Sequence, residues 1–422
     1  SMCFNKGESA LRRGRRSTGR CTAKDMAARP GLRVAGALLL ALTLSLVAAD
    51  TSLLKHIDKA PPHGTPSRPS STSSAAFGNL PPASVSRFVP ETSRSWRGND
   101  ALRFSSTYAQ GTTVRGFLCS DFVRIGPYGS FSPFCCVTSV SGMFDGSGIA
   151  GFAPPSRRDP NSQFPPLPPL FLSLANVTGQ DTAKHDMPVP KPIFSFLSSP
   201  HNAELQLGGY DEDSVEGKMM TVDSLSKYAY VVPVTSISLG KTPILTLTPD
   251  AKSSPHPKAS AILDSGTTCV CLPDNHMKGA AEGLSPWERF SKAWEGETLN
   301  SLHVEVDGRI QVEIPSSVWV PQMQGVKGCL MKHCPNDHIV LGDWLFQSWL
   351  VMFDLGPTSE EKAPSIGFAK RRGSYKVGQN YQTHERKGGV TKVAMSREKL
   401  SKQFDTPNMP GYAKPPPSTP SS

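Results

Sequence analysis

Short apolar runs that alternate with polar residues recur through the middle of the chain. Alternation with a period of two residues is typical of half-buried β-strands. The pattern predicts strands over residues 116–125, 203–208, 229–234, 302–306 and 310–314. Helical spacing is seen in few places, of which residues 167–175 and 276–294 are the best. Many short strands with few helices predict an all-β protein built as a barrel or a sandwich.

The two ends of the chain lack this pattern. Residues 50–90 are rich in serine and proline and poor in large apolar side chains. They cannot bury enough surface to offset the entropy of ordering, so we expect them to form a linker. Residues 373–422 are basic and polar and end in a proline-rich run. We expect this segment to be a basic, disordered tail.

An uncharged, mostly apolar segment spans residues 34–49. It is short for a membrane-spanning helix but long enough for the core of a signal peptide. Read from Met26, it has a basic lead and ends in Val47-Ala48-Ala49, a small-residue cleavage pattern. Residues 1–49 are therefore expected to comprise a basic lead and a secretory signal, which places the protein outside the cell or in the endomembrane lumen. The alternative is a membrane anchor formed by residues 34–49.

The chain has 422 residues and a net charge of +10, and the position of this charge matters more than its size. Residues 1–49 contain nine Lys and Arg against two acidic residues, and residues 370–422 contain eleven against three. The segment between them carries 25 basic and 30 acidic residues. Because the folded middle is mildly acidic, we expect no nucleic-acid partner.

Entry into the secretory pathway would permit disulfide bonds. Cys329 and Cys334 are expected to form a local disulfide, whereas a zinc site that adds His333 and His338 is disfavoured because no C-x-x-C spacing is present. A glycine pattern that resembles a dinucleotide-binding loop, residues 146–151, is followed at once by two prolines instead of a helix. No metal or organic cofactor is expected.

One further residue agrees with the secretory pathway, and two others are cysteines on one predicted strand. Asn176 begins an N-glycosylation sequon. Cys269 and Cys271 alternate along one predicted strand, where buried thiols commonly pack as small hydrophobic groups.

One carboxylate lies in a setting suited to chemistry. Asp264 ends the short apolar run 261–263 and is followed by Ser265, Gly266 and Thr267. A strand would hold the carboxylate rigidly, the hydroxyls could hydrogen-bond it, and the glycine would allow a tight turn. Taken alone, the Asp-Ser-Gly sequence would be typical of a simple turn after a strand. The G-x-S-x-G sequence of serine hydrolases is not found here.

Further motifs give this turn a context. The run Ile339-Val340-Leu341-Gly342-Asp343 and then Ser365-Ile366-Gly367-Phe368-Ala369 follow it in the chain. This ordered set resembles the carboxy-terminal lobe of the pepsin-like aspartic proteases. Residues 107–118 resemble the flap hairpin of that family, and residues 144–153 are similar to its Asp-Gly loop. The resemblance covers roughly residues 85–370.

The resemblance implies an all-β, bilobal, pepsin-like acid protease fold. The amino-terminal lobe would comprise residues 91–235 with the flap, and would be incomplete. The carboxy-terminal lobe would comprise residues 236–372. The resemblance also implies an aspartic endopeptidase that acts on proteins or peptides. We expect a monomer, with membrane contact only if the signal segment stays uncleaved.

Residue roles follow from the same resemblance. Asp264 corresponds to the second catalytic carboxylate of the family, and Ser265 and Thr267 would orient it. Gly266 would allow the turn, and Tyr108 in the flap would close over the substrate.

The first catalytic motif of the family, Asp-Thr-Gly, is not found where the resemblance places it. The Ser/Pro-rich linker occupies that stretch, and the only similar string is Asp50-Thr51-Ser52, which lacks the glycine. We consider, in order, a truncated or mis-spliced copy of an active enzyme, an inactive relative that acts as a protein- or peptide-binding or inhibitor-like module, and a half-site completed by a second chain.

Overall fold

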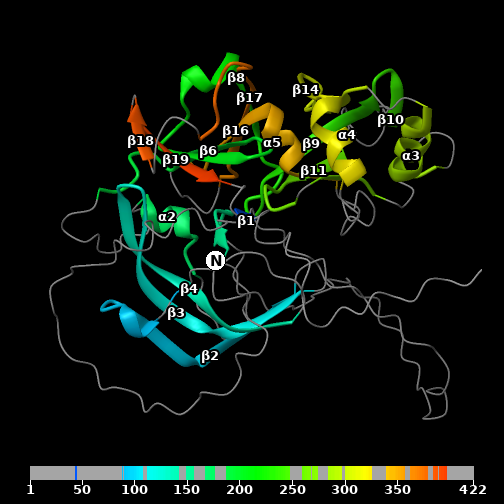
Figure 1. Cartoon of the computed structure of the whole chain (residues 1–422). Coiled ribbons are helices and arrows are strands. Elements are labelled where there is room, and N and C mark those ends of the chain that lie inside the picture. The colour runs from blue at the N-terminus through cyan, green and yellow to red at the C-terminus, as the bar shows by residue number, and fades with distance from the viewer. Residues whose placement is uncertain are drawn as a thin grey trace, which may run out of the picture.

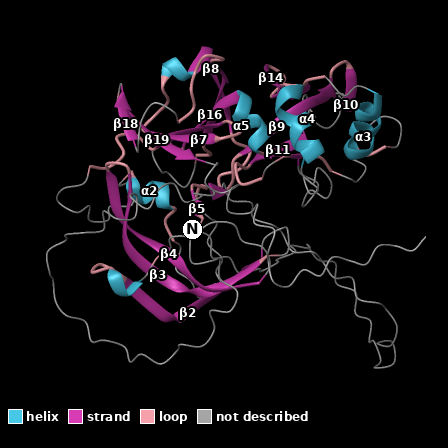
Figure 2. Ribbon diagram, in the orientation of Figure 1, coloured by secondary structure: helices cyan, strands magenta, loops and turns pink. Residues whose placement is uncertain are grey.

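Strands dominate the fold. The computed structural model describes residues 43–44, 88, 90–107, 112–141, 149–155, 167–175, 187–247, 259–267, 269–273, 284–296, 300–325, 339–356, 362–378, 384–387 and 389–396. A three-stranded sheet forms one body of the molecule, and two larger sheets with short helices form the other (Figure 1, Figure 2). The predicted all-β, bilobal fold is confirmed.

The three-stranded sheet belongs to the amino-terminal part of the chain. It consists of β2 (Arg97–Thr107), β3 (Thr113–Ile125) and β4 (Tyr128–Ser141), in the order β2-β3-β4. A buried carboxylate, Asp121 on β3, fixes the segment that leads into β2. Its Oδ1 accepts hydrogen bonds from the hydroxyls of Ser93 and Ser95 and from a backbone N–H. A short pair of strands, β1 (Thr43–Leu44) and β5 (Ala150–Gly151), lies apart from this sheet.

A seven-stranded central sheet has the order β18-β19-β7-β6-β16-β17-β8, and all its pairs are antiparallel. Its strands come from two distant parts of the chain, before residue 224 and after residue 348. They are β6 (Ile193–Ser198), β7 (Asn202–Leu207), β8 (Val215–Asp223), β16 (Trp349–Asp354), β17 (Ser365–Arg371), β18 (His384–Lys387) and β19 (Val390–Ser396).

The sheet of the carboxy-terminal lobe also has seven strands, in the order β12-β15-β11-β9-β13-β14, with β10 on β9. Its one parallel pair among the described strands joins β11 to β15. The strands are β9 (Val231–Leu239), β10 (Thr242–Thr246), β11 (Ala259–Leu263), β12 (Val270–Cys271), β13 (Leu302–Val306), β14 (Ile310–Ile314) and β15 (Ile339–Leu341).

The helices are short and lie against the sheets. They are α2 (Leu170–Leu174), α3 (Pro286–Gly296), α4 (Ser316–Gly325) and α5 (Asp343–Ser348), with 3₁₀ turns at Pro90–Thr92 and Glu212–Ser214. A capping box begins α3, because Ser285 and Glu288 each accept the other's backbone N–H through their side chains. No helix in the described segments is long and apolar enough to cross a membrane.

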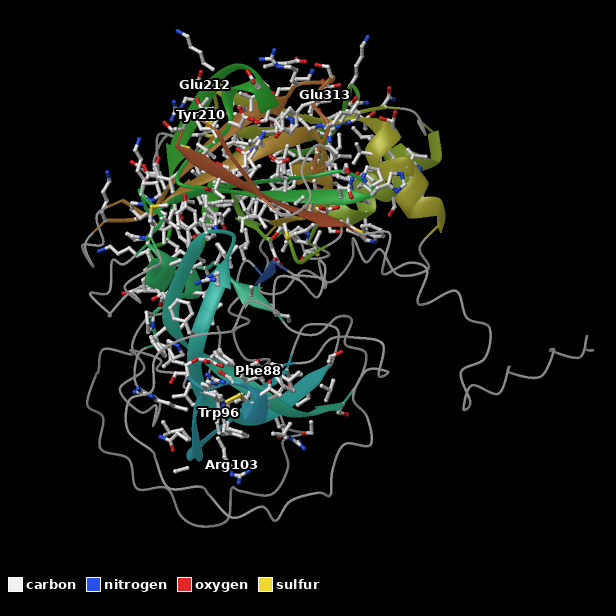
Figure 3. All side chains as sticks on the ribbon, turned by 60° about the vertical axis from the view of Figure 1, so that its left-hand side comes forward. Phe88, Trp96, Arg103, Tyr210, Glu212 and Glu313 are labelled. Carbon is white, nitrogen blue, oxygen red and sulfur yellow. A yellow bond between two sulfur atoms is a disulfide. The ribbon has the colours of Figure 1, made fainter. Side chains whose placement is uncertain are left out.

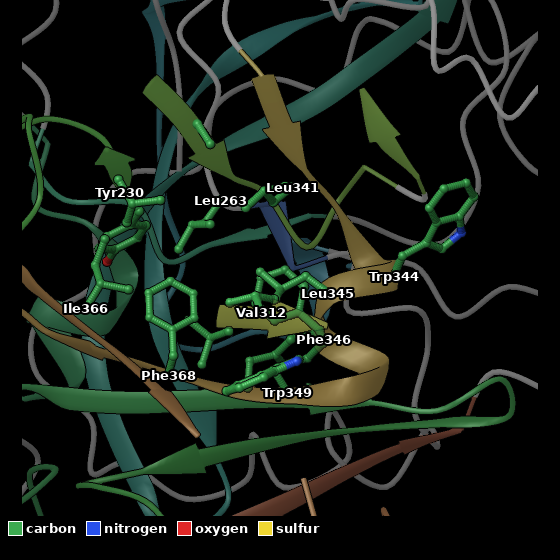
Figure 4. Close-up of a cluster of buried hydrophobic side chains, with 14 of the residues drawn as sticks. Tyr230, Leu263, Val312, Leu341, Trp344, Leu345, Phe346, Trp349, Ile366 and Phe368 are labelled. Atoms are coloured by element: carbon green, nitrogen blue, oxygen red, sulfur yellow. The ribbon is translucent and has the colours of Figure 1, made fainter. Parts of the chain in front are cut away.

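One large hydrophobic core joins the central sheet to the carboxy-terminal lobe. Leu263, Leu341, Val312 and Phe346 meet in it (Figure 4), and each is less than 2% exposed. Both sheets contribute, which explains why the strand ends that carry candidate chemistry are held rigidly. Packing at this density transmits small displacements directly to neighbouring groups.

Two predictions about boundaries are wrong. The tail expected to be disordered from residue 373 contains β18 and β19, which extend the central sheet to Ser396. The lobe boundary placed between residues 235 and 236 falls inside β9, which pairs with β11 and β13 of the carboxy-terminal lobe. Alternation identifies a strand but does not show which sheet the strand joins. The last strand was not predicted, because the residues on either side of it are basic and polar.

Tyr230 provides a test of the packing between the Ala150–Gly151 region and the core. Its hydroxyl donates to the Phe152 carbonyl at 2.7 Å, and burial raises the pKa of Tyr230 well above its ordinary value. The unfolded chain loses the Tyr230 proton near pH 10, whereas the folded chain keeps it. The contribution of the buried, neutral Tyr230 to the free energy of unfolding is therefore full below pH 10 and is lost as pH rises further. Tyr230→Phe is expected to cost about 1 kcal/mol at neutral pH and to weaken the alkaline loss of stability. Urea unfolding at pH 7 and above pH 10 measures both, and equal alkaline slopes would contradict the assignment.

A disulfide between Cys119 and Cys136 crosses from β3 to β4, and Figure 3 shows a yellow bond on this sheet. The two residues are 17 positions apart in sequence. Closing a loop of this length lowers the entropy of the unfolded chain, so we expect the Cys119→Ser/Cys136→Ser variant to lose about 2 kcal/mol. Thermal unfolding followed by circular dichroism measures the loss, and an unchanged Tm would show that the bond contributes no stability.

Candidate active site

Asp264 directly follows β11, the central strand of the carboxy-terminal lobe. Ala261, Ile262 and Leu263 are buried and pair in parallel with β15. The Asp264 backbone continues this pairing, because its N–H donates to the Leu341 carbonyl at 3.1 Å. An apolar strand buried on both faces therefore sets the position of the carboxylate, as the sequence pattern predicts.

The turn after Asp264 bonds to its own carboxylate. The Gly266 N–H donates to Oδ1 at 3.0 Å, and the Thr267 hydroxyl donates to Oδ2 at 2.7 Å. The Thr267 N–H closes the turn on the Asp264 carbonyl at 3.1 Å. Asp264 is only 5% exposed. Hydrogen bonds to both oxygens fix the carboxylate in one orientation, which is a requirement for a catalytic group.

A second layer supports this turn from below. Gly342 packs so closely that a Cβ added there would lie 2.1 Å from the Cys269 carbonyl oxygen and 2.3 Å from that of Thr267. The next residue, Asp343, donates its N–H to the Thr267 carbonyl at 2.7 Å. Its carboxylate accepts hydrogen bonds from the side chains of Ser198 and Gln347, both at 2.7 Å. Asp343 thereby ties the turn to β6 of the central sheet.

Two members of the predicted set behave differently from expectation. The Ser265 hydroxyl is buried without a hydrogen-bond partner and does not contact the Asp264 carboxylate. Gly266 contributes its N–H and is not among the residues with positive φ, so the turn does not depend on a left-handed glycine. The sequence predicted that both Ser265 and Thr267 would hydrogen-bond the Asp264 carboxylate, but only the Thr267 hydroxyl does so.

Several predicted residues lie outside the described residues. Tyr108 falls in the connection between β2 and β3, of which only the two strands are described. The same holds for Asn176 and for Cys329 and Cys334, so their predicted roles stay predictions.

The cysteines next to the site correct one interpretation. Cys269 and Cys271 were expected to be buried thiols, but both are disulfide-bonded. Both are buried, so burial was anticipated while the bond was not. Within the described part of the chain, no group of three or more metal-ligating side chains is present.

A buried, oriented carboxylate at the end of a strand can act as an acid or a base toward a bound water. The sequence model for eukaryotic aspartyl proteases matches residues 72–370. The chain belongs to this family. Membership explains why the Asp264 turn, the Gly342–Asp343 loop and β17 occur in this order along the chain.

Two curated aspartyl proteases are similar to this chain. Secreted aspartyl protease 1 of Malassezia globosa is 25% identical over 292 residues, which is 66% of each chain. Barrierpepsin of Saccharomyces cerevisiae is 25% identical over 303 residues, which is 64% of this chain and 48% of the relative. The chain thus spans about two thirds of the first and about half of the second.

Sequence reasoning missed the supporting role of Asp343 and its partners. Asp343 was visible as part of the Leu-Gly-Asp motif, but Ser198 lies 145 positions away and gave no signal. The packing of α5 against β6, beside the pairing of β6 with β16, brings the two segments of this aspartyl protease together.

Proposed function

We propose that this chain is an aspartic endopeptidase in which Asp264 is one of two carboxylates that activate a water against a peptide bond. The observation that carries the proposal is the Asp264 carboxylate, buried and bonded through both oxygens to Gly266 and Thr267. Two close carboxylates that share a proton differ in their tendency to ionise. One can accept a proton from water while the other protonates the substrate carbonyl.

Residue roles in this proposal follow the contacts. Asp264 would contact the water, and Thr267 would hold one of its oxygens. Gly266 would hold the other through its N–H. Tyr108 would close over the substrate from the flap, and Ser265 would have a partner only once the facing part of the cleft is in place. A buried hydroxyl without a partner is rare in a completed site, which supports this view of Ser265.

A second candidate is an inactive relative that binds proteins or peptides. One observation favours it: in the stretch before residue 107, Asp50-Thr51-Ser52 is the only string similar to the first catalytic motif, and it lacks the glycine. The fold and the cleft could then bind an extended peptide without cleaving it.

Hydrolysis of a quenched peptide at acidic pH, with and without pepstatin, separates the two candidates. The full chain is compared with Asp264→Asn, with Thr267→Val and, as a matched control, with Asp223→Asn on the exposed end of β8. The endopeptidase proposal expects activity in the full chain and in the control, none in Asp264→Asn, and at least a tenfold loss in Thr267→Val. Pepstatin binding without hydrolysis in any sample would favour the binding module. Specific activity that rises with protein concentration would indicate a site shared between two chains.

We also propose that the protein enters the secretory pathway. The predicted signal in residues 1–49, the disulfide-bonded cysteines and the similarity to a secreted aspartyl protease of Malassezia globosa support this. Expression in a eukaryotic secretory host, followed by N-terminal sequencing and deglycosylation, tests it. The expected result is a cut after Ala49, which would also remove β1 and its pairing with β5, and a mass shift that Asn176→Gln removes. An intact residue 1–49 segment on a membrane-bound protein would indicate the anchor instead.

A further inference from the structure

The last two described strands form the edge of the central sheet. β19 pairs antiparallel with β7 over six residues, from Thr391 opposite Leu207 to Ser396 opposite Asn202. Among the described strands, β18 pairs only with β19. Residues that follow both lobes in sequence therefore complete a sheet whose other strands belong to those lobes.

One face of β19 is built into the main core. Val393 and Met395 are buried in the same cluster as Leu205 and Leu207 of β7. The backbone at the end of β7 lies close to the backbone that leads into β19, and a glycine allows this approach. Gly208 has φ +90°, and a Cβ there would lie 3.3 Å from the carbonyl oxygen of Gly389, just before β19. The edge of β7 is therefore shaped to receive a strand.

The other face of β19 carries a buried charge. Lys392 is 6% exposed, and its Nζ lies 3.1 Å from Oδ2 of Asp211, which is 7% exposed. Asp211 is joined in turn to β7, because its N–H donates to the Gln206 side chain at 2.7 Å. Nζ also lies 5.9 Å from the centre of the Tyr375 ring. Lysine is rarely buried unless it is paired, so this position is specific for a cation.

A second buried carboxylate, Glu204, lies two residues along β7 from Gln206, the residue opposite Lys392. Glu204 is fully buried and accepts hydrogen bonds from Gln206 and from the Tyr375 hydroxyl, both at 2.7 Å, and from the Gly378 N–H at 3.1 Å. Without Lys392, the buried carboxylate of Asp211 would lose the cation that lies 3.1 Å from it. Removing one member of a buried ion pair is costly because it leaves the other charge uncompensated.

β19 also reaches the three-stranded sheet. The Tyr128 hydroxyl, at the start of β4, lies 2.9 Å from the Thr391 hydroxyl, and both residues are at most 1% exposed. Figure 1 shows the β3–β4 hairpin rising from the lower sheet toward β19. Thr391 and Lys392 are neighbours on opposite faces, so one strand contacts the flap-bearing sheet on one side and the Asp211 cluster on the other.

We propose that β18 and β19 form a carboxy-terminal strap, that the edge of β7 is a strand-binding surface occupied in cis by this strap, and that Lys392 locks it in place. The strap couples the three-stranded sheet to the central sheet through Tyr128 and Thr391. Strand addition to a sheet edge takes its affinity from main-chain hydrogen bonds and its specificity from side-chain pockets. Here the pocket is the Asp211–Glu204 cluster, and the side chain that it selects is a lysine.

Hydrogen exchange of the full chain, followed by mass spectrometry, tests the lock. Lys392→Met keeps most of the length of the side chain and removes its charge. Lys370→Met on β17 of the same sheet is the matched control, because its Nζ is exposed and 3.9 Å from Glu313. Lys392→Met is expected to speed exchange at least tenfold in residues 390–396 and in the β3–β4 turn. Exchange in β13 and β14 should stay as in the unchanged chain, which shows that the variant is folded. Lys370→Met should leave exchange unchanged both in residues 390–396 and in the β3–β4 turn.

A peptide that spans residues 384–396, labelled at one end, tests the surface. It is expected to bind the full-length Lys392→Met chain, whose own strap is released, and to bind the unchanged chain at least tenfold more weakly. The same peptide with methionine in place of lysine should bind neither. The proposal is overturned if β19 in the unchanged chain exchanges as fast as a free peptide, if Lys392→Met exchanges like the unchanged chain, or if the two peptides bind equally.

Discussion

Gly342→Ala is expected to destabilise the protein by more than about 3 kcal/mol and to displace the turn that carries Asp264. An added Cβ would lie 2.1 Å and 2.3 Å from the carbonyl oxygens of Cys269 and Thr267. Both are backbone atoms, and the Thr267 carbonyl also accepts the Asp343 N–H. The strands β12 and β15 would have to separate, because no side-chain rotation relieves these contacts.

The effect should appear in two independent measurements. Urea unfolding gives the loss of stability, and hydrolysis or pepstatin binding reports on the Asp264 turn at temperatures where the variant is still folded. Gly373→Ala is the matched control, because nothing lies within 4 Å of a Cβ built there and its φ is not positive. We expect the control to stay within about 0.5 kcal/mol of the unchanged chain. A stable Gly342→Ala chain with unaltered binding would show that the two strands are not packed as the structure has them.

Local patterns predicted the regular parts of the fold well. The expected strands 302–306 and 310–314 coincide with β13 and β14. Each alternates strictly, and one face of each is buried in the core, so the period of two is complete. The position of Asp264 at a strand end was also visible, because the apolar run before it is short and bounded by turn residues.

Continuous apolar runs were harder to interpret. Residues 343–354 contain α5 followed directly by β16, and the sequence pattern predicted neither element. An apolar run without clear periodicity fits a buried helix and a buried strand equally well. α4 was missed for a related reason, because it contains valine, tryptophan and Pro321, which favour helices weakly.

Long-range contacts could not be predicted from either end. β19 is buried on both faces, so Val390 to Ser396 does not alternate, and its lysine reads as part of a solvated basic tail. That lysine pairs with Asp211, which follows β7 and lies 181 positions earlier in the chain. The disulfide bonds of Cys269 and Cys271 belong to the same class, because pairing depends on the fold and not on spacing.

A second large effect is expected in the three-stranded sheet of β2, β3 and β4. Gly116 lies at an irregularity in the pairing of β3 with β4, and a Cβ there would lie 1.9 Å from the Cys136 carbonyl oxygen and 2.7 Å from the Phe104 ring. Gly116→Ala should therefore force the two strands apart and cost more than about 3 kcal/mol. Gly98→Ala in β2 of the same sheet is the comparison, because its nearest atoms, at 2.5 Å and 2.8 Å, belong to the Trp96 side chain, which can move. We expect Gly98→Ala to lower the free energy of unfolding by about 1 kcal/mol. Equal free energies of unfolding for the two variants would mean that β3 and β4 are not as close at Gly116 as the structure has them.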